Sequence, residues 1–313
     1  MLFQLAFTVS YSKKIMNEYR KYLDPETIAK LGNIELKAKM IVEGFITGMH
    51  RSPYHGFSVE FSQHRQYRPG DEIRFLDWKV YARSGRYYIK EFEEETNLRA
   101  MIAIDSSASM KFAANNRISK FEYSCYLASA LAMLMIQQRD AVGLTLYNNE
   151  IKTFLPSNSK PSYISQILFA LENAVPQDTT GTANALEILA ERINRRGLII
   201  IFSDFFDDID SIVNALRHLR HKRNEVLLFQ ILDPREIDFD FGNAANFIDL
   251  ETGEQMVTQP FQIRKGYAST MKDFLARLQK ECLHHKIDYN LIDTSTPFDK
   301  ALMNYVLKRE ASF

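Results

Sequence analysis

The sequence predicts an α/β protein with a doubly wound, mostly parallel sheet and a small β-rich region at its N-terminus. From residue 98 onward, short apolar runs alternate with longer segments whose apolar residues recur every three or four positions. The first 97 residues lack this alternation and carry turn signals between short segments. We therefore expect an N-terminal helical and β-rich region at 1–97. The main α/β domain then spans 98–313 and ends with a strand and a helix.

Each element of the main domain has a local cause in the sequence. Pro161 opens one helix and Gly197 closes another, while residues 197–204 are apolar enough for a strand buried on both faces. A short "NNE" turn joins two strands as a hairpin. In chain order, the expected strands are 97–107, 141–148, 150–156, 197–204, 224–233 and 288–293, and the expected helices are 117–140, 161–174, 182–196, 208–222, 267–286 and 297–309. A loop and hairpin are expected at 234–262.

The N-terminal region reads differently. Residues 25–50 have a helix-like pattern, and residues 56–96 look like short strands around turns at "RPGD" and "RSGR". Basic and aromatic residues interleave between Arg65 and Lys90, a pattern that can serve single-stranded nucleic acid. Acidic residues within and just after this segment weaken that interpretation. We favour salt-bridged packing or a protein docking face there, and we expect no nucleic-acid partner.

The composition excludes several classes of protein. Lys+Arg and Asp+Glu balance at 39 each, so no global field attracts nucleic acid or an anionic membrane. Cys125 and Cys282 lie far apart in helical patterns, which suits buried thiols in a reducing compartment. The sequence shows no leader pattern and no apolar run of roughly 20 residues. We expect a soluble, cytoplasmic protein without membrane insertion.

A polar cluster follows the first apolar strand of the main domain. The stretch "MIAIDSSASM", residues 101–110, ends in a carboxylate and three serines. In the spacing Asp-x-Ser-x-Ser, alternate residues of an extended loop can direct Asp105, Ser107 and Ser109 to the same side. Ser106 then points elsewhere.

Two further segments can reach the same edge of the sheet, because ligands in open α/β sheets bind at the carboxyl ends of the strands. Asp204 follows another buried strand, and Thr182 stands after Gly181 at the start of a helix. Carboxylates and hydroxyls form an all-oxygen set that suits a hard cation. The ligand set favours Mg²⁺, allows Mn²⁺ and disfavours zinc.

These residues resemble the metal-ion-dependent adhesion site (MIDAS) of von Willebrand factor A domains, which have a Rossmann-like fold. The order of elements matches that family across residues 98 to about 232. The resemblance implies that Ser107, Ser109 and Thr182 ligate Mg²⁺ and that the aspartates act largely through water. It also implies that a carboxylate of a partner protein completes the coordination. This chain has "TTGT" where the family has Gly-Gly-Thr, so Thr180 is the alternative to Thr182.

A second resemblance covers nearly the whole chain. Residues 50–110, 227–241, 249–254 and 289–302 are similar to bacterial proteins of domain-of-unknown-function family 58. That family is itself similar to von Willebrand A domains and is typically encoded beside MoxR-type AAA+ ATPases. The resemblance implies a binding protein rather than an enzyme. We expect an adaptor or partner of such an ATPase in protein assembly or maturation.

The alternative is a Mg²⁺-dependent phosphohydrolase with Asp105 as nucleophile and Asp204 as metal ligand. Haloacid-dehalogenase-like phosphatases are similar in outline, but they carry a second Asp two residues after the first. This chain has Ser107 there, and serine cannot act as the general acid and base at neutral pH. The sequence also has no Gly-rich lysine loop and no HExxH helix. The pattern therefore favours binding over catalysis.

Overall fold

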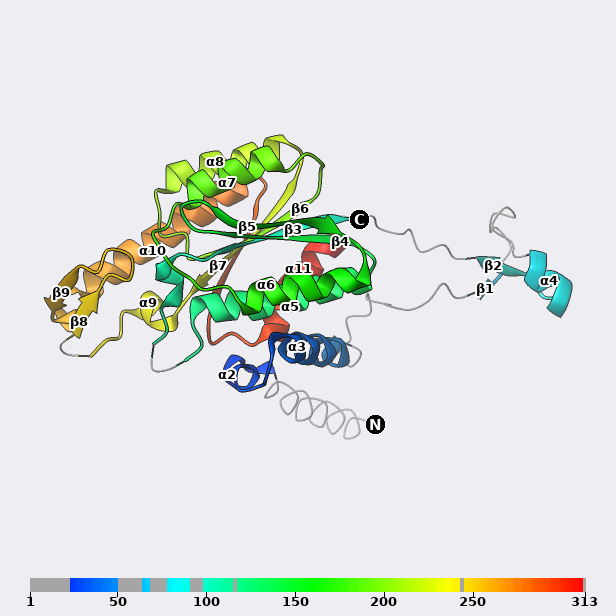
Figure 1. Ribbon diagram of the computed structural model, residues 1–313, viewed down its shortest axis with the longest axis horizontal. Helices are drawn as coiled ribbons and strands as arrows, with labels where there is room; N and C mark the ends of the chain where they lie inside the picture. The colour runs from blue at the N-terminus through cyan, green and yellow to red at the C-terminus, as the bar shows by residue number, and fades with distance from the viewer. Residues whose placement is uncertain are drawn as a thin grey trace, which may run out of the picture.

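The computed structural model describes residues 23–49, 64–67, 78–90, 98–114, 117–242 and 245–311. At its centre lies a six-stranded sheet with the order β10–β7–β6–β3–β4–β5 (Figure 1). The strand β5 runs antiparallel to β4, and the other neighbouring strands are parallel. The predicted fold class is thereby confirmed. The strands are β3 (Arg99–Asp105), β4 (Ala141–Tyr147), β5 (Ile151–Asn158), β6 (Leu198–Ser203), β7 (Glu225–Leu232) and β10 (Asp288–Asp293).

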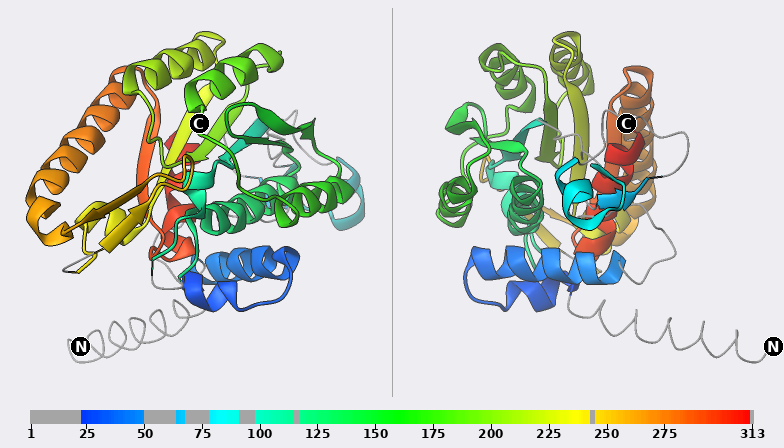
Figure 2. Two further views of the ribbon diagram at one scale, coloured as in Figure 1. Left: turned by 60° about the vertical axis from the view of Figure 1, so that its left-hand side comes forward. Right: turned by 90° about the vertical axis from the view of Figure 1, so that its right-hand side faces the viewer.

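Helices cover both faces of the sheet, as Figures 1 and 2 show. Alternate residues of β3 belong to two separate apolar clusters, with Ile102 and Ile104 in one and Met101 and Ala103 in the other. This alternation arises because successive side chains of a strand point to opposite faces. The first face is covered by α5 (Lys120–Gln137), α6 (Ile164–Glu172) and α11 (Phe298–Ala311), and the second by α7 (Thr182–Arg192), α8 (Ile209–His221) and α10 (Pro260–His284).

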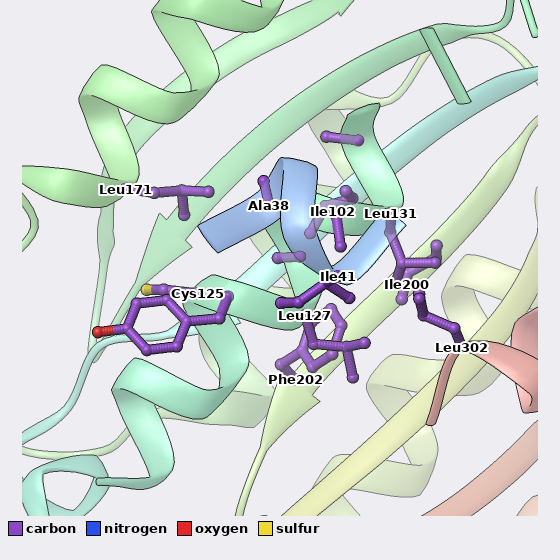
Figure 3. Close-up of a cluster of buried hydrophobic side chains, with 14 of the residues drawn as sticks. Ala38, Ile41, Ile102, Cys125, Leu127, Leu131, Leu171, Ile200, Phe202 and Leu302 are labelled. Carbon is purple, nitrogen blue, oxygen red and sulfur yellow. The ribbon is translucent and has the colours of Figure 1, made fainter. Parts of the chain in front are cut away.

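Two helices before the main domain share its core. They are α2 (Pro25–Ala29) and α3 (Ile34–Met49). Ala38 and Ile41 of α3 lie in the same buried cluster as Leu127 of α5 (Figure 3), and Lys37 Nζ donates to the Tyr126 hydroxyl at 2.7 Å. Residues 25–49 therefore pack with the sheet although they precede residue 98, and the boundary at 97/98 itself stays a prediction.

The described part of residues 64–90 forms a small unit of its own, which lies apart from the central sheet in Figure 1. Its two strands, β1 (His64–Gln66) and β2 (Tyr88–Lys90), pair antiparallel. Between them, α4 (Trp78–Ser84) is a helix where we expected a strand. It ends at Ser84, and Gly85 follows with a φ of 66°, a conformation that glycine adopts without strain. The rest of the interleaved basic and aromatic segment, residues 68–77, lies outside the described residues.

The segment predicted as a loop and hairpin contains both a short helix and a hairpin. It holds α9 (Pro234–Asp238) and a separate pair of strands, β8 (Ala245–Ile248) and β9 (Gln255–Thr258). The following helix α10 begins at Pro260 rather than at residue 267, because proline at the first helical position has a φ already suited to the helix. None of the helices in the described ranges combines the length and apolar composition that a bilayer crossing requires.

Candidate metal centre

The predicted site residues gather where the strand order reverses. From β3 the chain passes through α5 to β4 on one side, and it later returns to β6 on the other side of β3. The carboxyl edge at such a reversal of strand order is where open α/β sheets bind ligands. Asp105 ends β3, and Asp204 immediately follows β6. Both carboxylates are therefore brought to this edge of the sheet.

Asp105 is fully buried and lies at the centre of a hydrogen-bond network. Its Oδ1 accepts from the Ser107 amide at 2.9 Å. Its Oδ2 accepts from Ser203 Oγ at 2.7 Å and from Thr182 Oγ1 at 3.4 Å. Burial, and then the charge of Asp204, raises the pKa of this carboxyl to about 7. An ionised Asp105 is therefore costly in the protein alone, and a nearby cation would relieve that cost.

The serine hydroxyls point in two directions, as the spacing predicts. Ser107 Oγ and Ser109 Oγ lie 3.0 Å apart. Ser106 Oγ instead donates to the Tyr147 carbonyl at 2.9 Å. Mg²⁺ holds six oxygens at about 2.1 Å in an octahedron, so adjacent ligands of one ion lie about 3.0 Å apart. The two hydroxyls are hydrogen-bonded to each other in the protein alone, and their separation also equals that edge.

The loop before α7 supplies the threonines. Thr182 is buried as the first residue of α7, and it is the threonine that contacts Asp105. Thr180 Oγ1 lies 3.4 Å from Ser109 Oγ. At Gly181 a Cβ atom would come within 2.8 Å of the Asn149 Cα, so only glycine fits without a shift of the backbone.

Two backbone hydrogen bonds hold this loop against the loop after β3. The Gln177 amide donates to the Ser106 carbonyl at 2.8 Å, and the Ala108 amide donates to the Asp178 carbonyl at 2.9 Å. These bonds lie on both sides of Ser107 and hold the backbone of the two loops together there.

Asp204 has a partner that the sequence analysis missed. Lys120, at the first position of α5, is fully buried and donates to Asp204 Oδ2 at 2.7 Å and to Glu236 Oε1 at 2.7 Å. The residue after Asp204, Phe205, has a φ of 57°, which costs a bulky residue about 1–2 kcal/mol and turns the chain sharply. No spacing in the sequence links Lys120 to Asp204, and the pair is visible only in the tertiary structure.

The charges of this cluster are unbalanced. Burial alone would lower the pKa of Lys120, but the charges of Asp204 and Glu236 outweigh burial and raise it, so the ammonium stays protonated. On the acid Glu236, burial has the opposite effect and raises the pKa. One ammonium contacts two carboxylates, those of Asp204 and Glu236, and the charge of Asp204 also acts on Asp105. A divalent cation beside Asp105 would offset the excess negative charge.

The donor set fits Mg²⁺ better than a softer metal. It consists of hydroxyl and carboxylate oxygens, which magnesium and manganese prefer. Within the described ranges, His, Cys, Asp and Glu side chains do not gather in groups of three or more that could hold a metal ion. A metal site in this part of the chain would therefore draw on other oxygen ligands as well, such as the hydroxyls described above.

Comparisons with known proteins place the chain among relatives of unassigned function. A family profile described as "Protein of unknown function DUF58" matches residues 63–276. Uncharacterized protein Mb1516 of Mycobacterium bovis and uncharacterized protein Rv1480 of Mycobacterium tuberculosis are each 29% identical over 247 residues, which is 77% of this chain and 75% of theirs.

Solved structures show more distant likeness. The conserved hypothetical protein BatB from Bacteroides thetaiotaomicron is 21% identical, with a TM-score of 0.46, over 69% of this chain and 100% of that one. An aerotolerance-related membrane protein from Bacteroides fragilis is 22% identical, with a TM-score of 0.46, over 67% of this chain and 99% of that one. Similarity at this level transfers no function to the chain.

Proposed function

Because the chain belongs to the DUF58 family, whose description assigns no activity, we propose its function from the strand-end cluster. We propose that it is a Mg²⁺-dependent protein-binding module rather than an enzyme. Ser107, Ser109 and Thr182 would ligate the ion, and Asp105 and Asp204 would act largely through water. Mn²⁺ can replace Mg²⁺ in such a set. When bound, the cation supplies a Lewis-acid position that a carboxylate of a partner can fill.

The observation that carries the proposal is the pair of hydroxyls beside a buried carboxylate. Ser107 Oγ and Ser109 Oγ lie 3.0 Å apart, and Asp105 is buried with its pKa raised to about 7. An arrangement that serves only the fold gains little from a carboxylate in such an environment. A bound divalent ion would account for both features, because it would take the two hydroxyls as ligands and would balance the charge of the buried carboxylate.

The resemblance to the adhesion site of von Willebrand A domains supports a protein partner with an acidic residue. We propose a MoxR-type AAA+ ATPase as that partner, in a cytoplasmic role in protein assembly or maturation. Catalysis is disfavoured because Ser107 stands where a phosphohydrolase needs a second aspartate.

Co-purification tests this function. The tagged full chain is recovered from its native cell in Mg²⁺ and, separately, after EDTA treatment. We expect the ATPase to be retained with Mg²⁺ and lost with EDTA or with Asp105→Ala. Retention that survives both treatments would make the metal-bridged interaction wrong. Turnover of generic phosphatase substrates with Mg²⁺, abolished by Asp105→Asn, would favour the hydrolase instead.

A further inference from the structure

The turn of the β8–β9 hairpin reaches the candidate metal centre. Glu251, in this turn, accepts two hydrogen bonds from one residue. The Thr180 amide donates to Oε2 at 3.0 Å, and Thr180 Oγ1 donates to Oε1 at 2.5 Å. Thr180 Oγ1 also lies 3.4 Å from Ser109 Oγ. The Glu251 carboxylate therefore contacts Thr180, and Thr180 in turn lies beside Ser109, a proposed ligand of the metal.

The turn presents this carboxylate in a fixed direction. Asp249 Oδ1 accepts from the Glu251 amide at 2.8 Å and from the Thr252 amide at 3.1 Å. Gly253 has a φ of 75° and closes the turn. Because the backbone on both sides of Glu251 is held in this way, its side chain projects from the hairpin toward the Thr180 loop (Figure 2 shows the hairpin beside the strand-end loops).

The hairpin is anchored at its base and exposed along its length. Phe247 stacks on Phe239 with ring centroids 5.5 Å apart. In contrast, Met256 and Val257 of β9 are 58% and 82% exposed. The turn is held to the Thr180 loop by the two hydrogen bonds that the Glu251 carboxylate accepts, and withdrawal of the turn has to break both.

We propose that the two donors of Thr180 form a carboxylate-binding position beside the metal centre, and that Glu251 occupies it. A carboxylate of a protein partner takes this position only after the hairpin turn withdraws. The ligand class is a single Asp or Glu side chain. This inference rests on the proposed function, because it places the partner's carboxylate next to the cation that Ser107 and Ser109 would hold.

Acetate is the probe for this position. The full chain is loaded with Mn²⁺, whose bound and free fractions are measured by electron paramagnetic resonance. The relaxation of the acetate methyl protons is then followed by NMR, with Mg²⁺-loaded protein as the diamagnetic baseline. Acetate that binds at the site and exchanges with free acetate passes close to the paramagnetic Mn²⁺. Its methyl protons then relax faster than they do with the Mg²⁺-loaded protein.

Removal of the resident carboxylate should open the position. We expect Glu251→Gln and Glu251→Ala to increase the acetate relaxation enhancement by at least threefold over the wild type at equal bound Mn²⁺. Glu254→Gln alters an exposed carboxylate of the same turn, and it should leave the enhancement unchanged.

The outcomes separate the two proposals. Equal enhancement in the wild type and both Glu251 variants, with Mn²⁺ bound in all of them, overturns the inference and leaves the metal site standing. Failure of Mn²⁺ to bind the wild type and the variants overturns the proposed function, and the inference with it. Faster hydrogen exchange of the Thr180 amide in Glu251→Ala gives an independent check that the contact existed.

Discussion

At Asp105, opposing influences act on a single carboxyl group. Burial and the charge of Asp204 raise its pKa to about 7, while the donors of Ser107 and Ser203 oppose the rise. Ionisation of this group in the protein alone is therefore less favourable than ionisation of a solvent-exposed aspartate. The nearby hydroxyls of Ser109 and Thr182 are neutral and cannot balance an ionised carboxylate. A bound cation would balance that charge, as the metal proposal requires.

Lys120 gives a prediction about stability at the same scale. Lys120→Met should leave the buried Asp204 without its ammonium partner, 2.7 Å away in the wild type. Loss of one member of a buried ion pair lowers the free energy of unfolding by about 3–5 kcal/mol. Urea unfolding measures this value. Lys111→Met, at an exposed lysine, is the control, and a similar small change in both variants would show that the buried pair contributes little.

Gly181 gives a prediction about the position of the threonine loop. Gly181→Ala places a Cβ within 2.8 Å of the Asn149 Cα, so the loop that carries Thr182 must shift. We expect Mg²⁺ affinity to fall by roughly tenfold, because misplaced ligands bind small cations poorly. Gly32→Ala is the matched control, since a Cβ there would meet nothing within 4 Å. Calorimetric titration that gave equal affinities for both variants would contradict a ligand role for this loop.

At the scale of elements, the pairing of the strands and the placement of the helices determine where the site residues lie. The parallel pairing of β3 with β6 sets the ends of both strands side by side, and α5 brings Lys120 to the same edge from one face. The start of α5 is fixed by a capping box in which Ser119 and Glu122 bond each other's backbone amides. The position of Lys120 therefore depends on that cap.

This cap can be tested on its own. Ser119→Ala removes the acceptor of the Glu122 amide, 3.2 Å away, and should lower the free energy of unfolding by about 1 kcal/mol. Ser119→Thr keeps an acceptor oxygen and should lose less. Urea unfolding of the two variants checks the expectation. A larger loss in Ser119→Thr than in Ser119→Ala would show that packing, not capping, governs this position.

Periodicity predicted the sheet and most of its helices because tertiary packing here agrees with local pattern. Strand β10 spans 288–293 as expected, and membership of the family named from residues 50–110 is confirmed. The helix α4 was mistaken for a strand, since a seven-residue segment offers too few turns for a period to be read. The first turns of α10 were missed because Pro260 was assigned to the preceding loop and was not recognised as the start of the helix.

The candidate site could be predicted only in part. Asp105, Ser107 and Ser109 share one short stretch, so their spacing is visible in the sequence. Lys120 and Glu251 approach the site from segments distant in the chain, and no spacing reveals them. Their roles follow from tertiary contacts alone. The assignments of Mg²⁺ and of a protein partner stay predictions.

At the scale of the whole molecule, the thiols lie in the two apolar clusters on opposite faces of the sheet. Cys125 is buried in one cluster and Cys282 in the other. Burial raises the pKa of Cys282 to about 12 and that of Cys125 also well above its usual range. Both groups are thus protonated thiols at neutral pH and react poorly.

This burial predicts slow chemical labelling of the native chain. At pH 8 we expect iodoacetamide to modify neither cysteine appreciably until denaturant unfolds the protein, after which both react. Mass spectrometry of labelled protein follows the reaction. Rapid modification of Cys125 or Cys282 in the native state would show that the clusters open far more readily than their packing implies.

Calorimetric titration of Mg²⁺ into the metal-free full chain tests the central claim most directly. The wild type should bind one ion, and Ser107→Ala should reduce the affinity by at least tenfold because it removes a proposed ligand. Ser106→Ala should bind as the wild type does, since its hydroxyl faces the Tyr147 carbonyl. Equal titrations for the wild type and Ser107→Ala, or no Mg²⁺ binding by the wild type, would contradict a metal centre at the end of β3.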